Sequence, residues 1–242
     1  MSYEWHWNVL LENAGAHETY LDWILDGFAY TMALGLSAWV IALVTGTLFG
    51  TLRTIPNRGL SAIAALYVEI FRNVPLIVQL FVWYFVMPEL VPGGERIKQL
   101  APMQQQFIAA TLCIASYMGA RICEQVRAGI NSLPRGQRSA GLALGLSLPQ
   151  AYRYVLVPNA LRVMVPPLTS EFMSTFKNSA VASTIGLLEL AAQGRQLVDY
   201  TARPYESFIT VTVMYGLINL TVMVFMQWLE NRTRVPGLIG TK

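Results

Sequence analysis

The sequence predicts an all-α membrane protein with about five transmembrane helices. Of its 242 residues, 54% are hydrophobic and only 13% are charged, whereas ordinary soluble domains carry about 25% charged residues. Charge-free runs long enough to cross a bilayer occur at Gly27–Leu52 and Ser207–Leu229. The net charge of +3 is small and gives no indication of nucleic-acid binding.

The N-terminal segment, residues 1–26, is expected on the outer face of the membrane. It contains acids and aromatic residues such as Trp5 and Trp7 but no Lys or Arg. Tryptophan is enriched at membrane interfaces, and Lys and Arg concentrate in cytoplasmic loops. Because Arg53 and Arg58 directly follow Gly27–Leu52, the first span should run from outside to inside.

The second predicted span, Gly59–Met87, is interrupted. Near its middle lie Glu69, Arg72, Asn73 and Pro75. The residue before a proline disfavours helical geometry, so a break is expected at position 74. Charges in a membrane segment are costly and are presumptively functional, although Glu69 and Arg72 are also spaced to pair with each other.

The remaining spans alternate across the membrane. The fourth span is the least hydrophobic and carries Glu171, Lys177, Asn178 and Ser179. The expected order is an outer loop at 88–103, a third span at 104–119, a cytoplasmic loop at 124–162, a fourth span at 162–185, an outer and partly re-entrant segment at 187–205, and the fifth span at 207–229.

The loop Glu124–Arg162 is basic, punctuated by glycine and too polar to cross a bilayer. A short helix is expected at Gln137–Leu144, followed by a break at Gly145. A second helix should start at Ser147, with Pro149 in the tolerated first turn. A structured basic loop on the cytoplasmic side indicates docking to a cytosolic partner.

This loop resembles the EAA loop of bacterial ABC importer permeases of the polar amino-acid uptake family, which reads approximately E-x-x-R-x-G-(I)-x-(S)-(I/L)-P-x-G-Q-x-E-A-A-x-A-L-G-(L)-(S), followed by a run that ends P-x-A-(L)-R. Two positions depart from the pattern: Ser139 stands where the family usually has Glu, and Gly141 where it has the second Ala. The missing Glu could weaken a salt bridge to the ATPase. The matching residues are Glu124, Arg127, Gly129, Ser132, Pro134, Gly136, Gln137, Ala140, Ala143, Leu144, Gly145, Leu146, Ser147, Pro158, Ala160, Leu161 and Arg162.

Two further segments, EIFRNVPLIVQLF from Glu69 and FKNSAVASTIGLLEL from Phe176, resemble the same family. The resemblance covers roughly Thr31 to Arg234. It implies a type I ABC importer permease core with the N-terminus outside and the C-terminus cytoplasmic. The domain division is then an outer segment at 1–26, one permease domain at 27–234 and a cytoplasmic tail at 235–242.

The resemblance implies a multi-pass permease subunit of the bacterial inner membrane that moves a polar L-amino acid inward. Its partners would be a second permease chain, identical or related, two cytosolic ATPase subunits, and a periplasmic or surface substrate-binding protein. This chain would bind no cofactor and no metal, because ATP and Mg²⁺ would sit on the ATPase. The residues expected at the ATPase contact are Gly136, Gln137, Ser139, Ala140, Gly141, Ala143, Leu144, Gly145 and Leu146.

Glutamate or aspartate is the expected substrate, because the chain is similar to that subgroup and because Arg72 and Lys177 could neutralise an extra carboxylate. Two alternatives stay open: Glu69 and Glu171 could neutralise these cations, and Lys177 and Asn178 could hold a helix break together. The residues expected along the pathway are Glu69, Arg72, Asn73, Pro75, Glu171, Lys177, Asn178 and Ser179.

Two other classes of function fit less well. An ion-gradient-driven secondary transporter would need paired acidic ion sites and usually an internal repeat, and no convincing repeat is visible. A membrane-embedded enzyme would need a convergent catalytic set. The chain also lacks a nucleotide-binding loop of the type G-x-x-x-x-G-K-S/T, so we expect a translocation subunit and not an enzyme.

Overall fold

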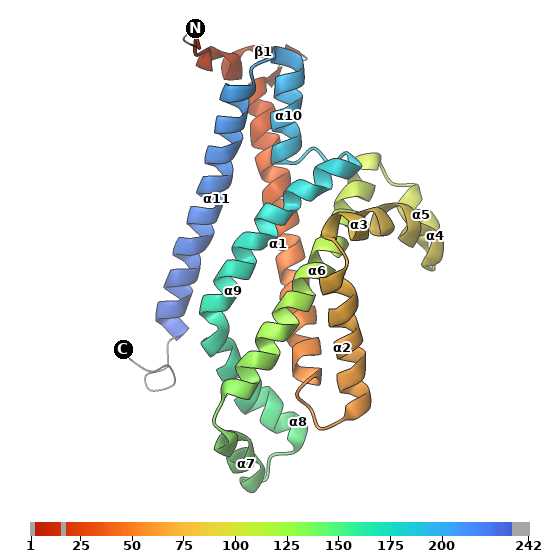
Figure 1. The fold of residues 1–242 in the computed structure, drawn as a ribbon, viewed down its shortest axis with the longest axis vertical. Coiled ribbons are helices and arrows are strands. Elements are labelled where there is room, and N and C mark those ends of the chain that lie inside the picture. The colour runs from red at the N-terminus through yellow and green to blue at the C-terminus, as the bar shows by residue number, and fades with distance from the viewer. Residues whose placement is uncertain (1–2, 16–17, 234–242) are drawn as a thin grey trace. The chain divides into compact units, whose positions relative to one another are not determined.

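The computed structural model describes residues 3–15 and 18–233, so Arg234 and the predicted tail 235–242 lie outside the described residues. The chain is almost entirely helical (Figure 1), which confirms the all-α prediction. In chain order the elements are the 3-10 helix η1 (Trp7–Leu11), strands β1 (Asn13–Gly15) and β2 (Glu18–Thr19), α1 (Tyr20–Leu52), α2 (Arg58–Asn73), α3 (Leu76–Phe81), the π-helical turn η2 (Val82–Val86), α4 (Met87–Leu90), α5 (Gly94–Lys98), α6 (Pro102–Ser132), α7 (Arg135–Ala143), α8 (Leu148–Ala151), the π-helical turn η3 (Tyr152–Leu156), α9 (Val157–Ser179), the 3-10 helix η4 (Ala180–Ile185), α10 (Leu190–Thr201) and α11 (Pro204–Thr233).

Three helices, α1, α6 and α11, are long and apolar enough to cross a membrane, and the bent pair of α2 with Leu76–Leu90 raises the possible number of spans to four. Helix α9 is 23 residues long but contains Pro166, Pro167 and charged residues. The arrangement of five spans, with its orientation, therefore stays a prediction.

The predicted break before Pro75 is confirmed. Val74 ends α2 in an extended conformation, with φ −87° and ψ 132°, as expected for a residue whose helical conformation clashes with the following proline ring. The chain bends by 105° between α2 and Leu76–Leu90. At the other end of α2, the Asn57 side chain accepts a hydrogen bond from the Leu60 N–H at 3.1 Å and caps the helix.

The described chain forms two compact units. The first comprises the chain up to Ala38, Leu76–Ile114 and Ser174–Leu220, and the second comprises Trp39–Pro75, Ala115–Met173 and the chain from Thr221. The long helices contribute residues to both units because each unit boundary falls within a helix or at the α2–α3 break.

In the first unit, the N-terminal segment is tied to the start of α11. The Tyr3 hydroxyl donates to Glu206 at 2.6 Å, and the His6 N–H donates to the same carboxylate at 2.8 Å. This hydrogen bond to a carboxylate is the main cause that raises the pKa of Tyr3 above its usual value. The predicted outer segment 1–26 is not all irregular, because α1 already begins at Tyr20.

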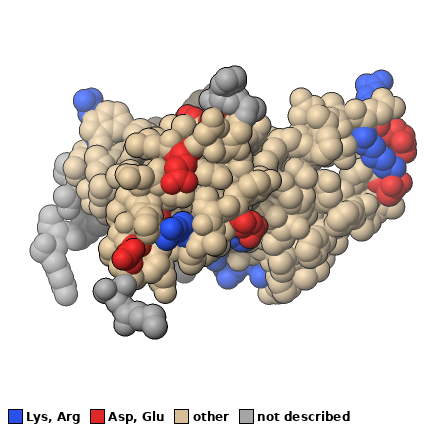
Figure 2. Space-filling model, turned by 90° about the horizontal axis from the view of Figure 1, so that it is seen from above, with Lys and Arg blue, Asp and Glu red and all other residues tan. Residues whose placement is uncertain are grey.

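Charges of both signs lie next to one another at α4 and α5 in the first unit (Figure 2). The Lys98 ammonium lies 2.6 Å from a Glu89 oxygen and 3.1 Å from a Glu95 oxygen. These carboxylates, Glu89 first, raise the pKa of Lys98. The mixed charges agree with the loop that was predicted at 88–103.

In the second unit, glycines let α1 approach α6 closely. A Cβ added at Gly50 would lie 2.5 Å from the Val126 Cβ and 2.7 Å from the Cys123 carbonyl oxygen. At Gly46 the nearest atoms would be 2.7 Å away, on Ile122. Small residues at helix interfaces allow such close approach in membrane proteins.

We expect Gly50→Ala to destabilise the protein by about 1–3 kcal/mol, because the added methyl group overpacks the α1–α6 contact. The measurement is the midpoint of thermal unfolding in detergent. Gly216→Ala is the matched control, since nothing lies within 4 Å of a Cβ at Gly216 in α11 and alanine favours a helix. Equal midpoints for the two variants would contradict the close packing.

Candidate functional site

The predicted cytoplasmic loop, 124–162, is only partly a loop. Its first residues, Glu124–Ser132, complete helix α6. The expected short helix is confirmed as α7, which runs from Arg135 to Ala143. The expected second helix start is also confirmed, because α8 begins at Leu148 with Pro149 in its first turn. The Gln150 side chain accepts a hydrogen bond from the Ser147 N–H at 2.8 Å, as in a capping box.

Gly145 ends α7 in the left-handed conformation, with φ +86°. The Gly145 N–H donates to the Leu142 carbonyl at 3.0 Å, and the Leu146 N–H donates to the Gly141 carbonyl at 3.2 Å. This pair of bonds is the Schellman motif, in which glycine takes a conformation that side chains disfavour. The break predicted at Gly145 is therefore a defined turn with paired backbone groups.

The residues expected at the ATPase contact divide by exposure. Gln137 and Leu146 are half-buried, and Gly141 is buried. A Cβ at Gly141 would lie 3.6 Å from the Ala151 Cβ, an ordinary packing distance, so Gly141 faces the neighbouring part of this chain, and its contact with an ATPase stays a prediction. Leu144 is 84% exposed, a large apolar side chain without cover on this chain. The exposed residues among those expected at the ATPase contact are Gly136, Ser139, Ala140, Ala143, Leu144 and Gly145.

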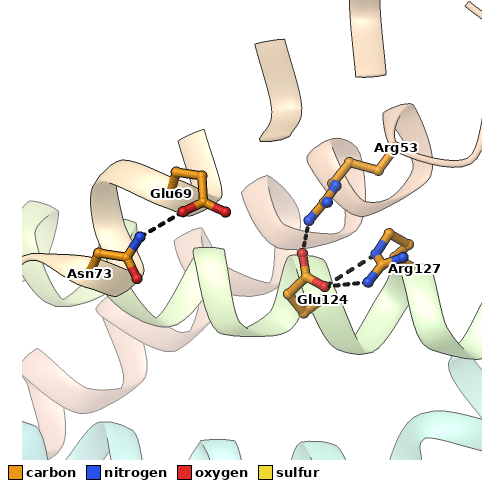
Figure 3. A network of polar contacts seen from close by, with 5 residues as sticks. All are labelled: Arg53, Glu69, Asn73, Glu124 and Arg127. Atoms are coloured by element: carbon orange, nitrogen blue, oxygen red, sulfur yellow. Dashed lines mark hydrogen bonds and ion pairs between the residues drawn. The ribbon is translucent and has the colours of Figure 1, made fainter. Parts of the chain in front are cut away.

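Glu124, where the basic loop was expected to begin, is held between two arginines (Figure 3). Arg53, just after α1, forms an ion pair with it. Arg127, one turn further along α6, donates two hydrogen bonds to Glu124 at 2.8 and 3.1 Å. Sequence analysis matched Glu124 and Arg127 to a motif but missed Arg53 as their partner.

The expected pair of Glu69 and Arg72 does not form. Instead, the Asn73 side-chain amide donates to Glu69 at 2.6 Å (Figure 3), and no ion pair joins Glu69 to Arg72 in the part of the chain that the structure describes. The spacing explains this outcome, since residues four apart on a helix lie on one face as readily as residues three apart. All of Glu69, Arg72, Asn73 and Pro75 are exposed on this chain.

Glu171 is buried in α9 and pairs with Arg121 of α6. The two carboxylate oxygens accept from Arg121 at 2.6 and 3.1 Å, a two-bond geometry that arginine favours. The expectation that Glu171 neutralises Lys177 therefore gives way to a pair with Arg121. Because 50 residues separate the two partners in the sequence, no local spacing could have indicated the pair.

Lys177, Asn178 and Ser179 form the last turn of α9 and belong to the first unit. Lys177 is exposed, Asn178 is half-buried and Ser179 is buried. The Ser179 hydroxyl donates to the Phe176 carbonyl at 2.7 Å. A cation in the last turn suits the helix dipole, and among the described residues no carboxylate lies within ion-pair distance of Lys177.

Glu189 was missed as an individual residue, although it lies within the matched segment FKNSAVASTIGLLEL. It is fully buried. It caps α10 by accepting from the Ala191 and Ala192 N–H groups at 3.0 and 2.9 Å, and the Tyr215 hydroxyl donates to it at 2.8 Å. An acid directly before an apolar helix start was the available signal.

Comparison with known proteins identifies the family. The family described as "Binding-protein-dependent transport system inner membrane component" matches residues 42–235. The chain belongs to this family. The Escherichia coli protein named "Glutamate/aspartate import permease protein GltJ" is 54% identical over 246 residues, an alignment that covers 100% of each chain. The E. coli "Glutamine transport system permease protein GlnP" is 32% identical and covers 88% of this chain and 93% of its own.

Solved structures of ABC transporters share the fold of this chain. A crystal structure described as an amino acid ABC transporter with histidines has a TM-score of 0.70 and 27% identity, and covers 88% of this chain and 95% of its own. The MetNI methionine ABC transporter, with 23% identity and a TM-score of 0.70 over 89% of this chain and 96% of its own, supports the fold alone. The resemblance predicted from the loop motif is thus confirmed for family and fold.

Removing either partner of the Arg121–Glu171 pair in this transport component should lower the free energy of unfolding by about 1–3 kcal/mol. In a double-mutant cycle with Arg121→Gln and Glu171→Gln, the double variant should lose less than the sum of the single variants. Thermal or denaturant unfolding in detergent measures this. The control cycle is Lys98 with Glu95, an exposed pair whose coupling should be near zero. Additive losses at Arg121 and Glu171 would disprove the pair.

Proposed function

We propose that this chain is the membrane permease subunit of an ATP-driven importer of glutamate and aspartate. The observation that carries the proposal is the 54% identity, over the full length of both chains, to a relative named as a glutamate/aspartate import permease. Membership of the binding-protein-dependent family disfavours the alternative, a transporter driven by an ion gradient. The family description also supports a bacterial inner-membrane location.

The partners follow from the same reasoning. A second relative, named "Glutamate/aspartate import permease protein GltK", is 26% identical over 96% of this chain, which supports a heterodimer of two related permease chains. Because the sequence has no nucleotide-binding loop, ATP and Mg²⁺ would be bound by two cytosolic ATPase subunits. A periplasmic binding protein would deliver the amino acid.

The exposed part of α7 is the proposed contact with the ATPase. Ala140, Ala143 and Leu144 are exposed and can enter a groove, as amphipathic helices do when they bind partners. Ser139 is also exposed, so a shorter, uncharged side chain would meet the ATPase where the family usually has Glu. Gly145 continues this surface and keeps the turn free of a side chain.

Gly145→Asp should uncouple ATP hydrolysis from uptake, lowering uptake by about tenfold or more, because an unpaired charge buried at the contact costs several kcal/mol. Uptake and ATP hydrolysis are measured together in proteoliposomes that hold the assembled transporter. Gly145→Asn is the control, since Asn also tolerates the left-handed conformation but adds no charge. Normal uptake by a well-expressed Gly145→Asp protein would refute the docking role.

The proposed pathway uses the polar residues at the two helix breaks. Arg72 is exposed without an ion pair to Glu69, and Glu171 is occupied by Arg121. These contacts leave the positive charges of Arg72 and Lys177 available for the carboxylates of an acidic amino acid. They favour a substrate role over the alternative in which Glu69 and Glu171 neutralise the two cations.

Uptake of radiolabelled amino acids by cells with and without this gene tests the substrate. Loss of glutamate and aspartate uptake is expected. In cells that carry alanine variants of Arg72, Asn73, Glu171, Lys177, Asn178 or Ser179, at least the Arg72 and Lys177 variants should raise the apparent KM for glutamate. If all six alanine variants show unchanged transport constants, the proposed pathway is contradicted. Loss of glutamine or arginine uptake alone would reassign the substrate and keep the importer.

A further inference from the structure

We propose that the turn between α1 and α2, residues 53–57, is a second coupling element that is clamped to the chain on both sides of the α7–α8 segment, residues 135–151, which is called the loop in this subsection. Arg53 and Tyr152 are the positioning residues of this clamp. The inference rests on the proposed function and adds to it a route by which motion of α7 and α8 reaches α1 and α2. All residues involved lie in the second unit.

The first contact joins the turn to the end of α6 before the loop. Arg53, directly after α1, pairs with Glu124, and each side chain is only 20% exposed. Partial burial makes the pair less screened by solvent than a surface ion pair. Because Arg127 holds the other Glu124 oxygen at 2.8 Å, the carboxylate keeps a fixed orientation toward Arg53 (Figure 3).

The second contact joins the same turn to the chain after the loop. The Tyr152 hydroxyl donates to the Thr54 carbonyl at 2.7 Å, across 98 residues of sequence. Tyr152 is 5% exposed and is the first residue of the π-helical turn η3, directly after α8. The carbonyl of Thr54 is thereby paired, as a partly buried backbone group requires.

The two contacts bracket the loop, since Glu124 precedes α7 and Tyr152 follows α8. A polar cavity of about 650 Å³, lined by Thr54, Asn131, Arg138 and Tyr152 among others, lies beside the second contact. The turn is therefore linked to the loop by discrete polar contacts next to open space. A displacement of the loop would pull on Arg53 and Thr54, and through them on α1 and on α2, which leads to the break at Pro75.

The test compares Arg53→Gln, Tyr152→Phe and the double variant in proteoliposomes that contain the assembled transporter and its binding protein. We expect substrate-stimulated ATP hydrolysis to stay near that of the original protein while uptake per ATP hydrolysed falls by about threefold to tenfold, which lies within the roughly twofold to thirtyfold effects of mutations along a coupling route. Arg53→Lys keeps the charge and should restore most of the uptake.

Arg58→Gln is the matched control, because Arg58 is an exposed arginine at the start of α2 and forms no ion pair within the described residues. Unchanged uptake per ATP in both Arg53→Gln and Tyr152→Phe would overturn the clamp. A parallel loss of ATP hydrolysis and uptake in both variants would also overturn it, since the two contacts would then serve assembly and not coupling. Tyr152→Phe removes a single oxygen, so it keeps the test valid if Arg53→Gln does not fold. If the original assembly shows no ATP-driven uptake, the proposed function itself fails.

Discussion

The first unit depends on one carboxylate that has no access to water. Glu189 lies at the start of α10 and is fully buried. It is tolerated there because α10 offers two N–H groups, α11 offers the Tyr215 hydroxyl and α1 offers the Thr31 hydroxyl at 3.5 Å. An unsatisfied buried charge is far more costly than a paired one. Satisfying this single group therefore fixes three helices against one another.

In the second unit, buried or partly buried carboxylates also need partners, and arginine side chains supply them in place of hydroxyl and amide groups. Glu171 receives Arg121, and Glu124 receives Arg53 and Arg127. Each acid joins segments that are distant in the sequence. For Glu171, which is buried within α9, the hydrocarbon of a bilayer would offer no replacement partner for an unpaired carboxylate. Polar contacts thus supply specific pairing where hydrophobic burial cannot distinguish one helix neighbour from another.

The local features of the fold could be predicted from the sequence, because they depend on residues that are close in the chain. Pro75 forces the break after α2, and Gly145 ends α7 in a conformation that favours glycine. Long-range features could not be predicted in this way. The partner of Glu171 lies 50 residues away. One local contact was also undecided, because spacing alone could not choose between Arg72 and Asn73 as the partner of Glu69. Helix α6 also continues past Glu124, since polar residues end a membrane span without ending a helix.

The π-helical turn η3 (Tyr152–Leu156) sets the rotational phase of the loop relative to α9. A π turn bonds each residue to the fifth one along, so it closes a ring one residue larger than an α turn. Each residue of an α-helix advances the chain by about 100° around the axis. Deleting one residue from η3 would thus turn α7 and α8 by about that angle around α9 while leaving helix content nearly intact. The direction in which Leu144 faces therefore depends on the number of residues in η3, a segment separate from α7 itself.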